Sequence, residues 1–392
     1  MRQIQLKTKT INRIGFITGN AFRQVLIAVF GMTVPFVVIH NSSKIIWGSF
    51  VPLLLFSLLA AQIINWGNKE YLLRIFSKTP GKINVAYSQN LVARLPILIF
   101  FSILTCFYFP VSFGIWISLW LSGRYLQQST EALIVYEKKF SASIVIELFA
   151  FAIFCIAFLL FNQHDLYFLL IFYSSYQILK GCSYFLLFYG FFNKANLKPD
   201  FSFFTVSFPF FVLSILGFLA SKVDVYLLAH LGNKIATSDY QIINSLLVFV
   251  MSLSALIYAP FTKNIYRNKK SVIQKTRNLL AISGLVLVPI SLCCITLIAC
   301  FYLGLHLSFL FYTIAFFYIF PSFLYGIEVI NLFRSHKEKT VVVILFFGAT
   351  ANTILSGLFL YFDFGMTGAL LGSAIAQLMV LFLFKLNLYF EK

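Results

Sequence analysis

Twelve long apolar runs restrict the folds that this chain can adopt. Each run has about twenty residues or more, the length that an α-helix needs to cross the hydrocarbon core of a bilayer. In lipid only helices and closed barrels satisfy their backbone hydrogen bonds, and barrel strands would alternate polar with apolar residues. The continuous runs therefore predict an all-α polytopic membrane protein with about 12 transmembrane helices, at 14–39, 44–66, 88–109, 112–136, 141–161, 165–192, 203–231, 238–263, 276–301, 308–333, 340–361 and 366–390.

The composition indicates lipid rather than water as the surrounding solvent. Of the 392 residues, 60% are hydrophobic and only 11% are charged, whereas soluble domains carry about 25% charged residues. The net charge of +18 does not indicate a nucleic-acid partner, because Lys and Arg lie between the apolar runs and not in a soluble domain. Membrane lipids are therefore an expected partner, and nucleic acid is not.

The distribution of basic residues predicts the orientation in the membrane. Of the 30 Lys and Arg residues, 23 lie on one side of the predicted spans, and only Lys44 and Lys234 lie on the other. Basic residues mark the cytoplasmic side, and an even number of spans returns both termini to one side. We therefore expect both termini in the cytoplasm, with the basic N-terminal segment leading into an uncleaved first span.

Short connections between the runs leave no room for a domain outside the membrane. The loop at 193–200 lies at the midpoint of the chain and predicts an N-terminal six-helix lobe at 1–192, a cytoplasmic linker at 193–200 and a C-terminal six-helix lobe at 201–392. Six spans in each half favour a parallel repeat about an axis normal to the membrane. In the longest cytoplasmic connection, 67–87, apolar residues at helical spacing predict a short interfacial helix.

Charged residues inside the predicted spans are the candidate functional residues, because a charge near the bilayer centre costs about 2.5–3.5 kcal/mol. The basic residues that lie deepest in their spans rank first: Arg23, Arg124, Lys180 and Lys222. Two acidic residues are candidates for ion coupling or ion pairing: Asp224 and Glu131. Three more lie within about two helical turns of a cytoplasmic span end, where a long side chain can reach water, and rank lower: Arg94, Glu147 and Glu328.

Spacing along single helices separates two interpretations of these charges. Arg124, Gln128 and Glu131 fall within about 60° of one another on one helix face. Such a stripe cannot face lipid, so it lines either a helix contact or an aqueous cavity. The alternative to a binding site is a structural ion pair, and Arg124 with Glu131 is one pairing to test. Lys222 and Asp224 are two residues apart and point to different faces, so each is expected to meet another partner.

Motifs of enzymes are absent from the sequence. It contains no Walker-type phosphate loop, no HExxH and no GxSxG, and its six cysteines form no CxxC pair or Cys/His cluster. We therefore expect no catalytic residue, no cofactor and no metal site. Without an ATP site, transport must use an ion gradient, the membrane potential or the gradient of the substrate, and H+ and Na+ are the candidate coupling ions. The small residues Gly365, Gly368, Gly372 and Ala376 predict close helix packing.

Several stretches of the C-terminal half resemble one transporter family. The segment from Asp224 to Gly232, followed by Asp239-Tyr240-Gln-Ile-Ile-Asn, resembles the seventh-to-eighth span signature of the Wzx-type polysaccharide and O-antigen flippases. These belong to the multidrug/oligosaccharidyl-lipid/polysaccharide (MOP) exporter superfamily. Pro260 before a basic loop, and the Gly-rich start of the last span from Phe364 to Ala374, are similar to the same family. At motif level the resemblance covers about fifty residues.

The resemblance implies a fold and a function. It implies two six-helix lobes around a central cavity that opens alternately to each side of the bacterial inner membrane. It also implies a lipid-linked oligosaccharide as the substrate, typically an undecaprenyl-pyrophosphate sugar repeat for lipopolysaccharide or another surface polysaccharide. Arg23 and Lys222, in the first spans of the two lobes, would then receive the anionic pyrophosphate together with Arg124 and Lys180.

Three other classes of membrane protein remain alternatives. A multidrug exporter of the same superfamily would line its cavity with acidic and aromatic residues, whereas the deepest charges here are four basic and two acidic residues. A membrane-embedded polysaccharide polymerase or glycosyltransferase typically carries a long periplasmic loop, and the outer loops here are short. A major facilitator would carry a Gly-x-x-x-Asp-Arg-type loop between spans 2 and 3, which this sequence lacks. We rank the flippase first and the drug exporter second.

Overall fold

A computed structural model describes residues 2–161, 165–192, 197–258, 270–335 and 337–390. Within these ranges the chain is entirely helical. It contains twelve helices of at least 21 residues, one short helix and two 3-10 turns, and no strand. Among the same residues, ten helices are long and apolar enough to cross a membrane. The prediction of an all-α polytopic membrane protein is confirmed.

The chain forms two compact units. The first contains residues 1–46 and 53–215, and the second contains residues 47–52 and 216–392. The division falls within two long helices, α2 (Lys44–Asn65) and α8 (Ser202–Leu231), and each contributes residues to both units. Part of the predicted linker, residues 193–196, lies outside the described ranges.

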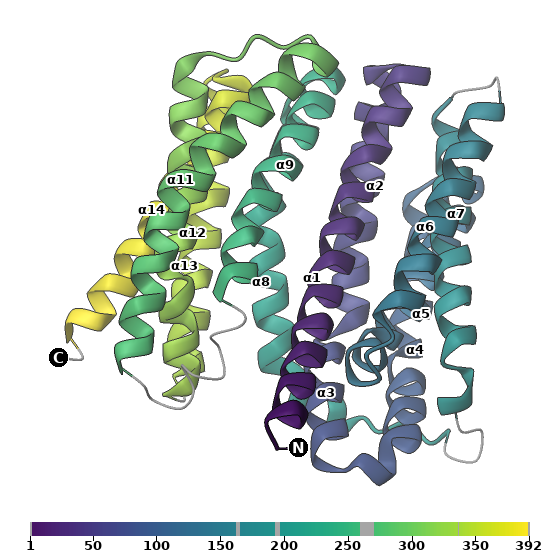
Figure 1. Cartoon of the computed structure of the whole chain (residues 1–392). Helices are drawn as coiled ribbons and strands as arrows, with labels where there is room; N and C mark the ends of the chain where they lie inside the picture. Colours follow the sequence, from purple (N-terminus) through teal and green to yellow (C-terminus); the bar gives the residue numbers. More distant parts are fainter. Residues whose placement is uncertain (1, 162–164, 193–196, 259–269, 336, 391–392) are drawn as a thin grey trace. The chain divides into compact units, whose positions relative to one another are not determined.

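The first unit is a bundle of long helices with one short helix at its end. The short helix α3 (Asn68–Lys78) lies at the end of the unit where α1 begins (Figure 1). It buries Tyr71, Leu72 and Phe76 on one face, as the helical spacing within 67–87 predicts. The long helices, besides the start of α8, are α1 (Arg2–Asn41), α2 (Lys44–Asn65), α4 (Ile83–Tyr108), α5 (Val111–Tyr136), α6 (Phe140–Leu160) and α7 (Leu166–Leu187).

The second unit contains the rest of α8 and five further helices. Gly372 of α14 packs against Ser356 of α13 so closely that a Cβ atom on Gly372 would lie 2.4 Å from the backbone nitrogen of Ser356. The predicted packing role of the small residues in the last span is therefore confirmed at Gly372. The five helices are α9 (Lys234–Tyr258), α11 (Lys270–Leu303), α12 (Phe309–Arg334), α13 (Glu338–Tyr361) and α14 (Gly365–Phe390).

Several helix ends differ from the predicted span ends, and for two of them the sequence shows why. Helix α1 begins at Arg2 and not near 14, because its polar first turns are helical without being apolar. Helix α7 ends at Leu187, and the prediction of 192 is wrong because the apolar residues after it form a 3-10 turn at Tyr189–Phe191. The predicted end of the span 238–263 lies outside the described residues, which stop at 258 in this region.

Two glycines bring α5 and α7 into backbone contact. A Cβ atom on Gly123 would lie 2.3 Å from the carbonyl oxygen of Gln177, and one on Gly181 would lie 2.3 Å from the carbonyl oxygen of Gly123. Only residues without a side chain allow such an approach. Arg124 and Lys180 are the direct neighbours of these glycines, so the contact also sets the spacing of the two cations.

Candidate functional site

Arg23 of α1 forms a bidentate ion pair inside the first unit. The whole residue is 1% exposed. Nη2 and Nη1 donate to the two carboxylate oxygens of Glu131 on α5, at 2.5 Å and 3.1 Å. Nε donates to Ser143 Oγ on α6 at 2.5 Å. One guanidinium therefore joins three helices, in the parallel two-bond geometry that Arg and a carboxylate favour.

Lys180 of α7 forms a second buried ion pair. Its Nζ lies 2.7 Å from Glu147 Oε2 on α6, and both side chains are buried. The other oxygen of Glu147 accepts hydrogen bonds from the Tyr184 hydroxyl at 2.9 Å and from Gln127 Nε2 at 3.3 Å. The ring centroid of Tyr176 lies 5.0 Å from Lys180 Nζ, within the range of a cation–π contact. The prediction ranks Glu147 low, but its carboxylate is fully buried between partners.

A neutral bridge joins the two ion pairs. The hydroxyls of Ser143 and Tyr184 lie 2.6 Å apart, and Ser143 also accepts from Arg23. The bridge makes one continuous polar network across α1, α5, α6 and α7. Ser143 and Tyr184 are not among the residues that the sequence predicts, because the prediction ranks charged residues only. In the sequence, each is marked only by one hydroxyl within an otherwise apolar run.

Within the described part of the chain, Arg124 of α5 is the cation of this network that forms no ion pair with a carboxylate. It is half-buried, and its Nη1 donates to Gln127 Oε1 at 3.2 Å. Its Nε is buried and has no hydrogen-bond partner within the described ranges, and no described carboxylate forms an ion pair with it. Of the two pairings open to Glu131, the described structure contains the one with Arg23, which donates to both carboxylate oxygens, and not a direct ion pair with Arg124. The network contains three cations and two carboxylates.

The second unit holds a separate polar cluster around Asp224 of α8. The buried Asp224 Oδ2 accepts from the Tyr240 hydroxyl at 2.5 Å, Ser373 Oγ at 2.9 Å and Asn244 Nδ2 at 3.1 Å. Asn244 Oδ1 accepts from Lys222 Nζ at 3.0 Å. Lys222 and Asp224 thus bond to different atoms of one amide and not directly to each other. They share Asn244 as a partner, so the expectation that they reach separate surroundings on different helix faces is not met.

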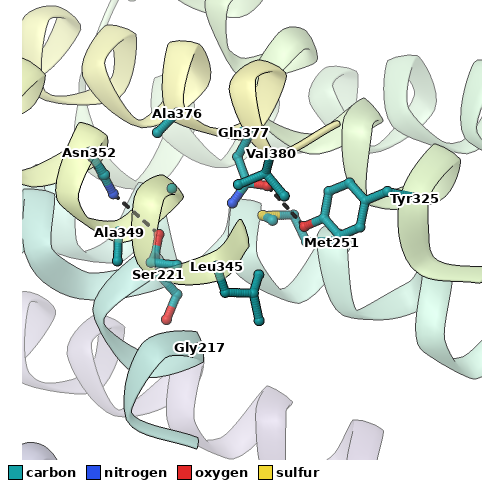
Figure 2. A pocket seen from close by; sticks show the side chains of 12 residues that line it. Gly217, Ser221, Met251, Tyr325, Leu345, Ala349, Asn352, Ala376, Gln377 and Val380 are labelled. Carbon is teal, nitrogen blue, oxygen red and sulfur yellow. Dashed lines mark hydrogen bonds between the residues drawn. The ribbon is translucent and has the colours of Figure 1, made fainter. Parts of the chain in front are cut away.

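A cavity of about 150 Å³ lies beside this cluster in the second unit (Figure 2). Its polar residues include Ser221, Tyr325, Asn352 and Gln377. The Tyr325 hydroxyl donates to Gln377 Oε1 at 2.9 Å, as Figure 2 shows. Asn352 Oδ1 accepts from Ser373 at 2.9 Å and so connects the cavity wall to the Asp224 cluster.

The remaining two predicted residues lie apart from these clusters. Glu328 of α12 pairs with Arg277 of α11 at 2.5 Å, and the Arg277 side chain is 39% exposed. Arg94 of α4 is fully buried and donates to Asn90 and Ser129. Its position near a span end predicts a side chain that reaches water. That prediction is wrong, because Arg94 finds hydrogen-bond acceptors inside the protein. No group of three or more His, Cys, Asp or Glu residues that could hold a metal ion occurs among the residues that the structure describes.

The sequence matches no protein-family model and no curated protein sequence. Solved structures share its fold over almost its whole length. The lipid II flippase MurJ in an inward closed conformation gives a TM-score of 0.71 at 14% identity, over 96% of this chain and 87% of that chain. An inward-facing multidrug resistance MATE family transporter of the MOP superfamily gives 0.63 at 10% identity, over 92% and 97%.

A third structure extends this similarity to a protein from Pyrococcus furiosus. A MOP superfamily transporter from Pyrococcus furiosus gives a TM-score of 0.60 at 11% identity, over 95% of this chain and 93% of that chain; reverse polarity of its binding pocket suggests a different function for it. The chain therefore has the fold of the MOP superfamily transporters. Of these three structures, the lipid II flippase is the most similar in fold.

Proposed function

We propose that the chain is a flippase that moves a lipid-linked oligosaccharide, such as an undecaprenyl-pyrophosphate sugar repeat, from the cytoplasmic to the outer leaflet of a bacterial inner membrane. The observation that carries the proposal is the excess of positive charge in the first unit. There, Arg124 keeps an unpaired Nε beside two neutralised ion pairs. The fold, which is shared with a lipid II flippase, supports a transporter of lipid-linked cargo.

A pyrophosphate is the chemical group that this arrangement suits. Its oxygens carry negative charge and accept hydrogen bonds without donating any, and a planar guanidinium can hold two of them at once. Arg23 and Lys180 already bond to carboxylates, so their part would be to hold the network in place and to contribute to its electrostatic potential. Arg124 and, in the second unit, Lys222 bond to neutral amides and keep their charge for a ligand.

Ion coupling is the second part of the proposal. Transport would proceed by alternating access, driven by a gradient of H+ or Na+ and without ATP hydrolysis. The candidate carboxylate for coupling is Asp224, since its charge is buried and surrounded by neutral donors. Cytoplasmic termini follow from the basic loops, and a role in O-antigen or another surface polysaccharide follows from the resemblance to Wzx-type flippases.

A multidrug exporter is the alternative that the same fold supports, because MATE family transporters share it. A cationic drug would need an uncompensated carboxylate, whereas Glu131 and Glu147 both pair with cations. The exporter therefore predicts loss of transport mainly at Asp224, and the flippase predicts it at Arg124.

Replacement of Arg124 tests the proposal. We expect Arg124→Gln to reduce export of surface polysaccharide at least tenfold in a complementation assay while membrane abundance stays near that of the parent, because no carboxylate loses its partner. Arg124→Lys keeps the positive charge but not the planar guanidinium that can bind two oxygens at once, and it should retain part of the export. Arg74→Gln, an exposed arginine on α3, is the matched control. Normal export by Arg124→Gln at normal abundance would refute the proposed role.

A further inference from the structure

Arg94 is a buried cation that pairs with no carboxylate among the residues that the structure describes. Its side chain has no exposed surface. Nε donates to Asn90 Oδ1 at 3.1 Å, and Nη2 donates to Ser129 Oγ at 2.7 Å. Both acceptors are neutral, and within the described ranges Arg94 forms no ion pair. A buried charge is costly unless a counter-charge and hydrogen bonds compensate it, so the position calls for a negative ligand.

Three donor groups at this position have no acceptor. Arg94 Nη1, the Tyr87 hydroxyl and Asn90 Nδ2 are all buried, and none has a hydrogen-bond partner in the described part of the chain. Tyr87, Asn90 and Arg94 follow one another at intervals of three and four residues, which places them on one face of α4. All three are at most 3% exposed, so bulk water does not satisfy them.

The neighbouring side chains on α5 do not provide the missing acceptor. Ser129 Oγ donates to the backbone oxygen of Tyr125 at 2.6 Å, and the Tyr125 hydroxyl donates to the backbone oxygen of Leu91. The Tyr125 ring lies against the guanidinium, 5.1 Å from its central carbon. The local acceptors are therefore engaged, while the three donors of α4 are not.

We propose that Arg94, Asn90 and Tyr87 bind a small inorganic anion, which is chloride in the cell. Chloride accepts hydrogen bonds without donating any, and it supplies the missing negative charge. A water molecule would be neutral and would need acceptors for its own two hydrogens. The bond from Arg94 Nε to Asn90 Oδ1 also fixes the amide so that its Nδ2 is available to the ion. This site is separate from Arg124 and does not depend on the proposed flippase function.

A cavity of the first unit reaches Asn90, one of the three residues of the proposed site. It has a volume of about 130 Å³, and Asn90 forms part of its wall. The exposed residues Thr79 and Lys82 line the same cavity, and the charge of Lys82 favours the entry of an anion. The carboxylate of Asp200 also lines it and acts in the opposite sense. Because the three donors are almost fully buried, a single-atom ion fits this position better than a phosphate with four oxygens.

Thermal unfolding of the purified full chain in nanodiscs tests the site. The midpoint is measured by tryptophan fluorescence in sodium gluconate and in sodium chloride at constant ionic strength. We expect chloride to raise the midpoint along a saturable curve. Tyr87→Phe removes one donor and should increase the half-saturating chloride concentration roughly tenfold. Arg74→Gln removes an exposed charge and should leave the curve unchanged, which separates the site from general screening.

Arg94→Gln removes the cation and should abolish the chloride response, and a further variant keeps the test decisive if Arg94→Gln does not fold. Asn90→Asp places a permanent carboxylate beside Arg94, so we expect the chloride response to vanish and the midpoint in gluconate to reach that of the parent in chloride. Bromide soaked into crystals should give an anomalous peak within hydrogen-bond distance of Arg94 Nη1. A parent midpoint that is the same in gluconate and chloride would overturn the proposal. An unchanged chloride response in Asn90→Asp would overturn it as well. So would a bromide peak that lies away from Arg94, which would show an adventitious ion only.

Discussion

The ion pair of Arg23 and Glu131 should contribute more to stability than a partly exposed pair of equal length. The perturbations are Arg23→Gln, Glu131→Gln and the double variant. The reference cycle uses Arg277 and Glu328, which also approach to 2.5 Å. The two pairs differ in the exposure of the cation, which is 2% for the Arg23 side chain and 39% for the Arg277 side chain.

The magnitude follows from burial. Removing one partner of a buried pair leaves an uncompensated charge and costs about 3–5 kcal/mol. Glu131 retains 19% of its side-chain exposure, so the lower end, about 3 kcal/mol, is appropriate for Arg23→Gln. We expect about the same loss for Glu131→Gln, since it leaves the Arg23 charge uncompensated. The double variant removes both charges and should lose only about 1 kcal/mol, so the coupling energy (the double loss minus the two single losses) has a magnitude of about 5 kcal/mol. The reference pair should couple by less than about 1 kcal/mol.

The assay is the free energy of unfolding in mixed micelles, measured by titration with a denaturing detergent for the four proteins of each cycle. A coupling energy at Arg23 and Glu131 that is no larger than that of the reference pair would refute the argument from burial. Export by the double variant gives independent information. If abundance recovers in Arg23→Gln/Glu131→Gln but export does not, Arg23 acts on the substrate; if both recover, its role is structural.

Two further predictions concern packing and orientation. Gly123→Ala should lower the free energy of unfolding by about 1–3 kcal/mol, because its Cβ would meet the backbone of α7. Gly31→Ala is the control and should not lower it, because the space around Gly31 is open. Equal stability of the two variants would contradict the close packing of α5 and α7. In a variant without native cysteines, single cysteines at residues 137–139 should react with an impermeant thiol reagent only from the cytoplasm, and those at 40–44 only from outside. The reverse pattern would show that the orientation drawn from the basic residues is wrong.

Most of the helices could be predicted because a long apolar run marks where a chain crosses lipid. The predicted run 44–66 corresponds to α2 at Lys44–Asn65, and 340–361 corresponds to α13 at Glu338–Tyr361. The prediction fails where the apolar run and the α-helical hydrogen bonding do not cover the same residues. The first turns of α1 are helical but polar, and the residues after Leu187 are apolar but form a 3-10 turn.

The charged candidates could be predicted, but their partners could not. The spacing of Arg124 and Glu131 shows only that they share a face of α5. The residue that pairs with Glu131 is 108 positions away on α1, and that distance in sequence leaves no local pattern. Neutral members such as Ser143 and Tyr184 were missed for the same reason, since a hydroxyl in an apolar run acquires its role only from the helices that pack around it.

Close packing and polarity in the first unit depend on each other. Helices α5 and α7 are the two long helices that fall outside the set apolar enough to cross a membrane on their own, and they are also the pair that meets at Gly123 and Gly181. Polar residues can be buried in lipid only where a partner lies within hydrogen-bond distance. Backbone contact at the two glycines brings α5 and α7 within that distance, so Gln127 and Tyr184 can both reach Glu147 on α6. The same packing that makes two weakly apolar helices stable in a membrane therefore holds the cations of the candidate site in a fixed array.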